Sequence, residues 1–538
     1  MAKSNNSHIT PYNRWVIILT GFGSITYGYC SSVISSTIGQ PGWYSYFDLP
    51  TQGEPGYGGK TTSTIATANG LYSAGGAIGT LLVMWTASAL GRRASIQLGA
   101  FTALVGGVLQ GGAAAIAMFQ VGRIVAGIGV GVLVTIVPMF ISELSPPGSR
   151  GWLVGHHAIF LVWGYLLASW VGYACYFATA HNEASAWRFP LCLQCLPPLV
   201  LLVGSPWLPH SPRWLISLDR HEEAFQIIRR LRTTKDDPNE IAAKEEFYQI
   251  REQVRVDNAK LKSSGQPVWK LVWTKKSYRK RMIVGFLTQW GSEFSGPLVI
   301  NNYSVILYTS LGMEGSMPLL LYALWSCTSS LIYNPFGAWL HDKVNSRRGM
   351  LMFGTAGCLV TTACLAAMIA EYAGTDNRAG NAAGIFFVFF YLTFEGTFCD
   401  TTMYIYVAEI FPTEIRPIGM GFSLFGQFAS TIILLQTAPI GFDRVGWKYY
   451  LVVIIWCAVF IPIIYFYFPE TARLSLEEIG QKFGDEVAVH VNDTTEEKRQ
   501  KLDEFLANTD IVHLGQGEGE KRADVVEVRQ EGSKAAEV

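Results

Sequence analysis

The chain has 538 residues, of which 50% are hydrophobic and only 15% are charged. Soluble globular proteins carry about 25% charged residues, so this composition argues against a water-soluble surface. Because the 41 basic residues balance the 41 acidic ones, no net charge favours nucleic acid as a partner.

Apolar runs between charged or Gly- and Pro-rich segments predict twelve membrane-spanning helices, since about 20 apolar residues cross a bilayer. The spans are expected near residues 14–38, 64–88, 95–117, 120–142, 152–178, 188–208, 282–311, 317–340, 350–372, 383–410, 418–438 and 446–468. The predicted fold class is therefore an all-α membrane protein with twelve transmembrane helices in two six-helix halves.

The polar segments set the expected division of the chain. We expect an N-terminal segment (1–13), a first half (14–208), a linker with amphipathic helices (209–281), a second half (282–468) and a partly disordered tail (469–538). Lys and Arg of the short loops fall on one side of the twelve spans, which predicts that this side and both termini are cytoplasmic. The expected location is the plasma membrane, with the first span as its own signal anchor.

One charged pattern occurs in both halves. In the stretches 138–151 and 406–419, a Glu is followed three residues later by Pro and seven residues later by Arg. Glu143 and Arg150 thus correspond to Glu409 and Arg416. Parallel repeats build transporters whose substrate site lies between the halves, and such charges could lock one gate. The alternative is that they are interfacial charges that only fix the topology.

Several motifs resemble those of one transporter family. They are "GRIVAGIGVGVLVTIVPMFISELSPPGSRG" (122–151), "LPHSPRWLI" (208–216), "PETARLSLEEI" (469–479), "ALGRR" (89–93) and "DKVNSRR" (342–348). With these motifs the chain resembles the fungal branch of the sugar porter family in the major facilitator superfamily. The glycines of 122–131 are expected to allow close helix packing.

The resemblance implies a cytoplasmic charge network, or gate. Its expected members are Arg92, Arg93, Arg123, Glu143, Arg150, Asp342, Arg347, Glu409 and Arg416. Two positions depart from the family pattern. Ser88 stands where the first loop usually has Asp, which predicts a weaker network in the first half. His210 replaces the Glu of the P-E-S-P-R-W-L motif.

The same resemblance locates the expected substrate pocket, where amide, hydroxyl and aromatic groups would bind a polyol. The predicted substrate-binding residues are Glu293, Asn301, Asn302, Tyr404, Gln427, His157 and Trp163. Ala158 stands where the family usually has Gln, so several substrate contacts differ. Asn301 and Asn302 are about 100° apart on a helix, and the sequence leaves open which of them faces the cargo.

Proton coupling is an open question at this stage. Proton-coupled members of the family carry an Asp in the first helix, but Cys30 occupies that position, and a thiol of ordinary pKa cannot replace a carboxylate. Either the protein is a facilitator or another acid has taken over. Acids inside the membrane are functional candidates, here Glu293, Asp400 and Glu395. Alternatively, Glu293 only accepts hydrogen bonds from cargo or His157, and Glu395 serves structural pairing.

The sequence thus predicts a secondary transporter that moves a sugar or polyol by alternating access, with protons as a co-substrate. A facilitative sugar uniporter and a carrier of quinate or another small organic acid remain alternatives. A sugar-sensing receptor is disfavoured because the tail is short. We expect no enzyme activity, no cofactor and no metal, and a monomer in the lipid bilayer. The sequence does not specify the sugar or the direction of transport.

Overall fold

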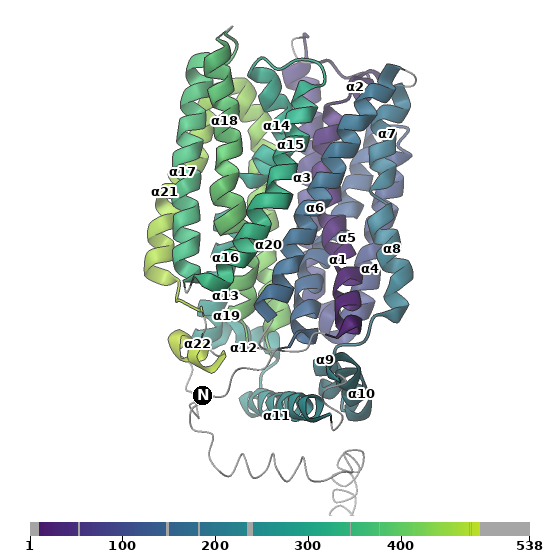
Figure 1. Cartoon of the computed structure of the whole chain (residues 1–538), viewed down its shortest axis with the longest axis vertical. Helices are drawn as coiled ribbons and strands as arrows, with labels where there is room; N and C mark the ends of the chain where they lie inside the picture. Colours follow the sequence, from purple (N-terminus) through teal and green to yellow (C-terminus); the bar gives the residue numbers. More distant parts are fainter. Residues whose placement is uncertain are drawn as a thin grey trace, which may run out of the picture.

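The computed structural model describes residues 10–51, 54–146, 150–180, 183–233, 240–344, 346–375, 377–412, 414–472, 474 and 476–484. All regular structure in these ranges is helical, which confirms the predicted all-α class. Long helices stand side by side in one bundle, and the short helices α9 to α12 and α22 lie across one end of it (Figure 1). We call this the linker end.

The first half contains six crossings of the bundle. Its helices are α1 (Pro11–Ile38), α2 (Pro41–Tyr46), η1 (Tyr57–Thr61), α3 (Thr62–Ala89), α4 (Arg92–Gly111), α5 (Ile116–Leu144), α6 (Arg150–Tyr176), η3 (Phe177–Ala180), α7 (Glu183–Leu193), α8 (Leu196–Gly204) and η4 (Ser205–Trp207). α7 and α8 form a single crossing. It is interrupted before Pro197, where the missing N–H of proline suits the first turn of a new helix.

Short helices connect the halves at the linker end: α9 (Pro212–Ser217), α10 (His221–Arg232), α11 (Ile241–Ser264) and α12 (Val268–Thr274). Arg232 attaches this layer to the bundle. Its Nη2 atom donates to Glu246 Oε1 in α11 (2.9 Å) and to the Leu144 carbonyl at the end of α5 (2.9 Å).

The second half repeats the six crossings. Its helices are α13 (Lys276–Glu293), α14 (Pro297–Ser310), α15 (Met317–Thr328), η5 (Ser329–Tyr333), α16 (Asn334–Lys343), α17 (Arg347–Tyr372), α18 (Arg378–Phe394), η6 (Glu395–Asp400), α19 (Thr401–Ile410), α20 (Arg416–Val445), η7 (Gly446–Tyr449) and α21 (Tyr450–Tyr467); α22 (Leu476–Phe483) follows. The seventh crossing begins at Lys276 rather than near residue 282.

The seventh crossing is also not one helix, as the sequence suggested, but two. α13 ends at Glu293, and Gly296 takes a φ of +103° before Pro297 starts α14. A positive φ costs glycine little, and proline cannot donate back into the preceding helix. The eighth and tenth crossings each contain a π-helical turn, η5 and η6, which the sequence did not predict.

The outer surface of the bundle is apolar. Large side chains such as Trp85 (66% exposed) and Phe466 (76% exposed) point away from the core. Within the described ranges, eight stretches are long and apolar enough to cross a membrane, and one of them contains both α20 and α21. The more polar α3 and the interrupted pairs α13–α14 and α15–α16 complete the twelve crossings.

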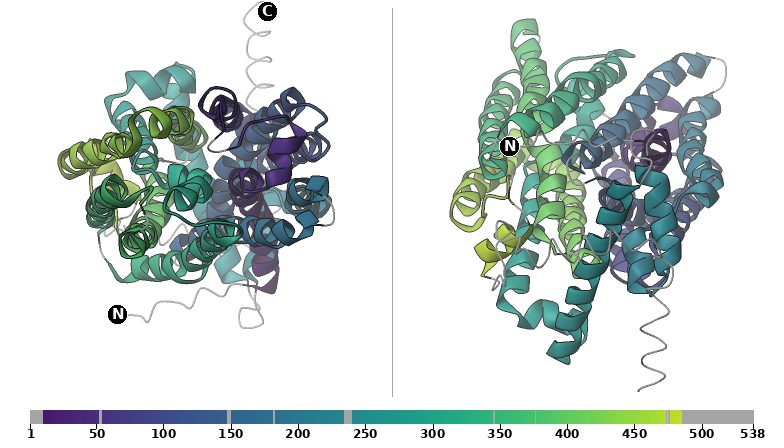
Figure 2. Two further views of the ribbon diagram at one scale, coloured as in Figure 1. Left: turned by 90° about the horizontal axis from the view of Figure 1, so that it is seen from above. Right: turned by 60° about the horizontal axis from the view of Figure 1, so that its bottom comes forward.

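The two halves lie next to each other, the first drawn from purple to blue and the second from green to yellow (Figure 2). α3 packs along α20, α1 along α14, and α6 along α15 across this boundary. Within the first half, α3 and α5 approach so closely that a Cβ atom at Gly127 would collide with the Tyr72 carbonyl. This contact confirms the predicted packing role of the glycines of 122–131.

Candidate substrate site and gate

A small cavity lies between the halves, beside Tyr27 midway along α1 and Leu161 midway along α6. Its volume is about 30 Å³, room for about two water molecules. Ligand pockets usually measure about 300–1,000 Å³, so the halves are packed closely around this point. The cavity is lined by Tyr27, Leu161, Tyr165, Glu293, Pro297, Leu298, Asn301, Trp325, Ser329, Glu395, Asp400 and Tyr404.

Glu293 reaches the cavity from the last residue of α13, directly before the helix break. Its side chain is buried, and its Oε1 atom accepts a hydrogen bond from Gln427 Nε2 (2.8 Å). Its Oε2 atom is also buried but has no hydrogen-bond partner among the described residues. An unpaired buried acceptor costs about 1–3 kcal/mol, so this atom favours a ligand that donates a hydrogen bond.

Gln427 of α20 connects Glu293 to both halves. Its Nε2 atom lies 3.1 Å from the hydroxyl of Tyr27 in the first half and 3.1 Å from the hydroxyl of Tyr404 in the second. Gln427 does not line the cavity itself, but it sets the positions of three groups that do.

Of the two asparagines, Asn301 is the one that lines the cavity. Its Oδ1 atom accepts from the Tyr322 hydroxyl (2.7 Å), and its Nδ2 atom is buried without a partner among the described residues. Asn302 instead donates to the Leu298 carbonyl of its own helix (2.9 Å). Among the fully buried side-chain atoms of the described cavity residues, Glu293 Oε2 is thus an acceptor and Asn301 Nδ2 a donor without a partner.

Two aromatic residues that the sequence placed in the pocket lie elsewhere. His157 is fully buried one layer behind the cavity, where Nδ1 contacts Ser24 Oγ (2.8 Å) and the ring meets that of Tyr404 edge-on (5.1 Å between centroids). Trp163 is 43% exposed on the outer surface. The prediction that Trp163 stacks on a sugar is wrong, because the inward face of α6 is carried by Leu161 and Val162.

Glu395 and Asp400 are the first and last residues of the π-helical turn η6, and both line the cavity. η6 packs against η5, whose first residue, Ser329, lines the cavity as well. π-helical turns insert an extra residue into a helix and often occur at functional sites. Together with Glu293, three carboxyl groups thus surround the cavity, and no Lys or Arg of the described ranges lines it.

Away from the linker end, side-chain hydrogen bonds also join the halves across their boundary. Asn69 Nδ2 of α3 donates to the Tyr303 hydroxyl of α14 (3.0 Å), and Ser32 of α1 bonds to Tyr322 of α15. A groove of about 560 Å³ opens nearby, with Tyr303 among its lining residues.

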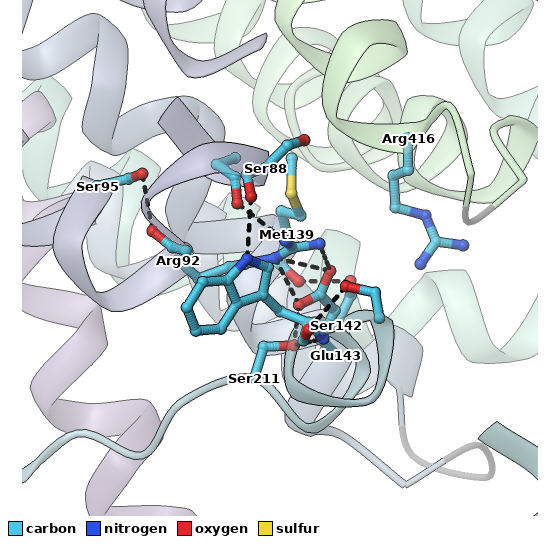
Figure 3. A network of polar contacts seen from close by, with 12 residues as sticks. Ser88, Arg92, Ser95, Met139, Ser142, Glu143, Ser211 and Arg416 are labelled. Atoms are coloured by element: carbon cyan, nitrogen blue, oxygen red, sulfur yellow. Dashed lines mark hydrogen bonds and ion pairs between the residues drawn. The ribbon is translucent and has the colours of Figure 1, made fainter. Parts of the chain in front are cut away.

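At the linker end, Glu143 is the centre of the first half's charge network (Figure 3). It accepts from Arg92 Nε (2.9 Å) and Nη2 (2.7 Å), and Ser211 Oγ donates to it as well (2.5 Å). The side chains of Arg92 and Glu143 are 8% and 2% exposed. Charge-assisted pairs with two parallel bonds are the strong ones.

In the second half, the distance between the paired arginine and glutamate is longer, and the glutamate side chain is more exposed. Arg347 Nη2 lies 3.5 Å from Glu409 Oε1, and the Glu409 side chain is 28% exposed; Thr471 donates to its other oxygen (2.7 Å). In the first half, Ser88 stands where the family usually has Asp, and its carbonyl accepts from Trp214 Nε1 (3.0 Å). The expectation that this change weakens the first half stays a prediction, because the side chain of Asp342, its counterpart in the second half, lies outside the described part of the structure.

A further acid of the second half, Glu470, was not predicted. It accepts from Ser346 Oγ (2.6 Å) and from the backbone N–H of Arg347 (2.8 Å). Burial raises the pKa of Glu470, but these bonds and those from the amides of Ala472 and Thr471 outweigh burial, so its pKa lies below the ordinary value.

The remaining predicted gate residues divide into three groups. Arg416 donates to the Phe411 carbonyl (3.2 Å) and points towards the Arg92–Glu143 pair (Figure 3). Arg93 contacts the Leu208 carbonyl (3.4 Å). The side chains of Arg150 and Asp342 lie outside the described part of the structure.

Arg123 does not belong to this network, which corrects the sequence-based grouping. It precedes Glu143 by 20 positions on the same helix, which places it about 30 Å away. There it is fully buried, donates to the Cys30 carbonyl (3.0 Å) and Asn69 Oδ1 (3.2 Å), and lies over the Tyr72 ring (4.1 Å).

The comparisons with known proteins agree with this architecture. Residues 16–483 match the family described as "Sugar (and other) transporter". The chain belongs to this family. It is a sugar porter of the major facilitator superfamily, and its relatives are transporters rather than enzymes.

Among the relatives of this sugar porter, the MFS-type transporter criB of Aspergillus cristatus is 29% identical over 91% of the chain and 97% of the relative. The high-affinity glucose transporter of Kluyveromyces lactis is 29% identical (88% and 86% covered), and a quinate permease of Neurospora terricola is 28% identical (86% and 87%). The proton:xylose symporter XylE, bound to 6-bromo-6-deoxy-D-glucose, has the same fold, with a TM-score of 0.73 at 20% identity over 88% of the chain and all of XylE.

Sequence reasoning missed Tyr27, Tyr165, Trp325 and Ser329, which also line the cavity of this sugar porter. Tyr27 lies three residues before Cys30, the position already singled out in the first helix. One helical turn connects them, so this signal was available.

Proposed function

We propose that the protein is a proton-coupled transporter that moves a neutral sugar or polyol by alternating access between its halves. The observation that carries this proposal is the pair of unpaired buried atoms, Glu293 Oε2 and Asn301 Nδ2, in a cavity between the halves. A sugar hydroxyl both donates and accepts hydrogen bonds, so a polyol can satisfy both atoms at once. Trp325 and three tyrosines around the cavity supply faces for a sugar ring.

The charge of the cavity supports a neutral cargo rather than quinate. Glu293, Glu395 and Asp400 line it, and no cationic side chain does. A carboxylated cargo would be repelled by these groups and would find no positive partner. His157 is separated from the cavity by Tyr404 and offers no direct contact to an anion.

The same three carboxyl groups are our candidates for proton coupling. When ionised they repel one another around one small space, and a proton relieves that repulsion. Glu293 is the leading candidate because it lies at the helix break and holds Gln427, which contacts the other half through Tyr27. Proton binding at Glu293 would thereby be coupled to the contact between the halves.

We also propose that the linker end faces the cytoplasm of a plasma-membrane protein that works as a monomer. The basic residues of the short loops, among them Arg92 and Arg347, lie at this end. In this proposal Glu143, Glu409 and the arginines around them form the inner gate, which loosens when the linker end opens.

The test is uptake of labelled glucose, xylose, a polyol and quinate in transport-deficient cells, at several external pH values and with or without a protonophore. Wild-type protein should accumulate a sugar and lose accumulation with the protonophore. Glu293→Gln should abolish accumulation but retain exchange of sugar across the membrane. Glu371→Gln, an exposed acid at the end of α17, is the matched control and should behave as wild type.

Other outcomes decide between the alternatives. Uptake that only equilibrates and ignores pH would identify a facilitator, as the loss of the first-helix acid at Cys30 allows. Uptake of quinate alone would contradict the neutral cargo. Accumulation that persists in Glu293→Gln would transfer the coupling role to Asp400 or Glu395.

A further inference from the structure

A groove of about 720 Å³ lies at the linker end of the first half, apart from the central cavity. Its walls come from four elements: the beginnings of α1 and α4, the end of the sixth crossing around η4, and α10 of the linker layer. The proposed cargo site does not include this groove, and of the residues that line it only Arg93 belongs to the expected gate.

The groove is cationic. Arg93 of α4 and Arg230 of α10 line it, and no acidic side chain of the described residues does. Within the same residues, Arg93 donates to the Leu208 carbonyl (3.4 Å), and the Arg230 guanidinium lies 4.0 Å from the centre of the Tyr12 ring. Neither arginine takes part in the ion pairs that the described residues form at this end, which involve Arg92, Arg220, Arg229 and Arg232.

The rim of the groove is aromatic and exposed. Trp15 is 41% exposed and Trp207 is 63% exposed, each at the end of an apolar crossing. Tryptophans in such positions lie at the level of lipid headgroups, where the ring is partly apolar and partly wet. The two guanidinium groups therefore lie at the depth of lipid phosphates.

A departure from the family motif removes one acid from the neighbourhood of this groove. His210 stands where the P-E-S-P-R-W-L motif has Glu, two residues beyond Leu208. Burial lowers the pKa of His210, and the nearby Arg93 and Arg220 lower it further, so the ring is neutral at physiological pH. Arg220 is already paired with Glu223 (2.6 Å), and no carboxylate of the described residues forms an ion pair with Arg93.

We propose that this groove binds the phosphorylated headgroup of an anionic phospholipid of the phosphoinositide class. Arginine forks bind phosphate oxygens in pairs, and basic pockets between helices at the membrane surface suit such headgroups. The volume exceeds that of a bare phosphate, and the tryptophan rim adjoins the acyl chains. Because one guanidinium comes from α10 and the other from α4, the lipid fastens the linker layer to the first half.

The test uses the full chain in phosphatidylcholine nanodiscs with or without phosphatidylinositol 4-phosphate, with lipid binding followed by native mass spectrometry and thermal unfolding. The phosphoinositide should raise the wild-type unfolding temperature. Arg93→Gln/Arg230→Gln should weaken binding about tenfold or more and remove most of this rise, since each lost charge-assisted bond contributes to affinity. Lys276→Gln/Arg279→Gln removes two exposed charges at the same end of the second half and should retain the full rise.

A second variant tests the charge argument directly. His210→Glu places a carboxylate beside Arg93 and should weaken phosphoinositide binding, whereas His210→Gln should not. Equal binding by wild type and the double arginine variant would overturn the proposal, as would an equal loss in the Lys276/Arg279 control. A rise of the same size with soluble inositol 1,4-bisphosphate alone would overturn the lipid assignment, because a free phosphate compound would then be the ligand.

Discussion

The two halves carry the same Glu motif at the linker end but build different contacts from it. Glu143 is almost fully buried and bonds Arg92 through two nitrogens, at 2.9 and 2.7 Å, with Ser211 as a third partner. Glu409 is partly exposed and lies 3.5 Å from Arg347. Glu409 has one short bond, from Thr471 (2.7 Å), and the acid that bonds the start of α17 at short distance is Glu470, which follows α21.

This difference shows that sequence symmetry does not imply energetic symmetry. A buried pair is costly to break, because the remaining charge stays in a medium that solvates it poorly, whereas a partly exposed pair is replaced by water at little cost. We therefore expect the first half to be the rigid partner at this end and the second half to be the one whose contacts rearrange. Three experiments test this expectation.

The largest effect is expected for Glu143→Gln, compared with the same change at Glu409. Glu143→Gln leaves the buried Arg92 without a counter-charge and should lower the free energy of unfolding by about 3–5 kcal/mol. Glu409→Gln should cost about 1 kcal/mol, since Arg347 keeps its bond to the His341 carbonyl (2.7 Å). Unfolding of the two purified variants in one detergent measures the difference. Equal losses would refute the asymmetry.

A middle effect is expected for Ser211→Ala. The hydroxyl of Ser211 donates to Glu143 Oε2 (2.5 Å) from the segment that leads into α9. A hydrogen bond to a charged group contributes about 1.5–3 kcal/mol, and the unfolding free energy should fall by that amount. The same hydroxyl also caps α9 by accepting from the Trp214 N–H (3.4 Å), so the change is repeated in the Glu143→Gln protein, where a smaller loss is expected. An equal loss in both backgrounds would assign the effect to helix α9 rather than to Glu143.

The smallest effect, about 1 kcal/mol, is expected for Glu470→Gln, and it should depend on pH. The folded protein holds the pKa of Glu470 below its ordinary value, so the folded state binds a proton less readily than the unfolded state. The stabilisation is therefore complete above the ordinary carboxyl pKa of about 4.3. It is lost as the pH falls through the lowered pKa. Unfolding temperatures of both proteins from neutral to acid pH should converge. If the difference between the two unfolding temperatures did not change with pH, the negative charge of Glu470 would not be the source of the stabilisation.

Much of the fold could be predicted because the hydropathy of successive segments determines which of them cross the membrane. Twelve apolar runs, their order and the polar linker all follow from hydropathy, and the structure has twelve crossings. The internal interruptions could not be predicted in the same way. The turns η5 and η6 change the backbone hydrogen-bond pattern without a sequence signature such as the Gly296–Pro297 pair.

Some of the residues that the family resemblance placed in the pocket do line one cavity. Glu293 and Asn301 lie on either side of the helix break in the seventh crossing, and Tyr404 joins them from a segment more than 100 residues further along the chain. Trp163 does not line the cavity, because neighbouring residues on a helix point in directions about 100° apart and Leu161 and Val162 face inwards instead. The prediction that Arg123 belongs to the gate is wrong because Arg123 was assigned to it from a shared motif. The rise of 1.5 Å per residue along a helix already places Arg123 far from Glu143.

The amide nitrogen of Gln427 has fewer hydrogens than it has oxygen neighbours. Its Nε2 atom has two hydrogens, but three oxygens lie within 3.1 Å of it, on Glu293, Tyr27 and Tyr404. At any instant at least one oxygen receives no hydrogen from Gln427, and no single arrangement is best for all three. An arriving hydroxyl group can complete this deficient set without displacing a complete one. In the closed molecule one of these oxygens is thus always ready to accept a hydrogen bond. A cargo hydroxyl can bond to it before any internal hydrogen bond breaks, which lowers the free-energy barrier to cargo binding.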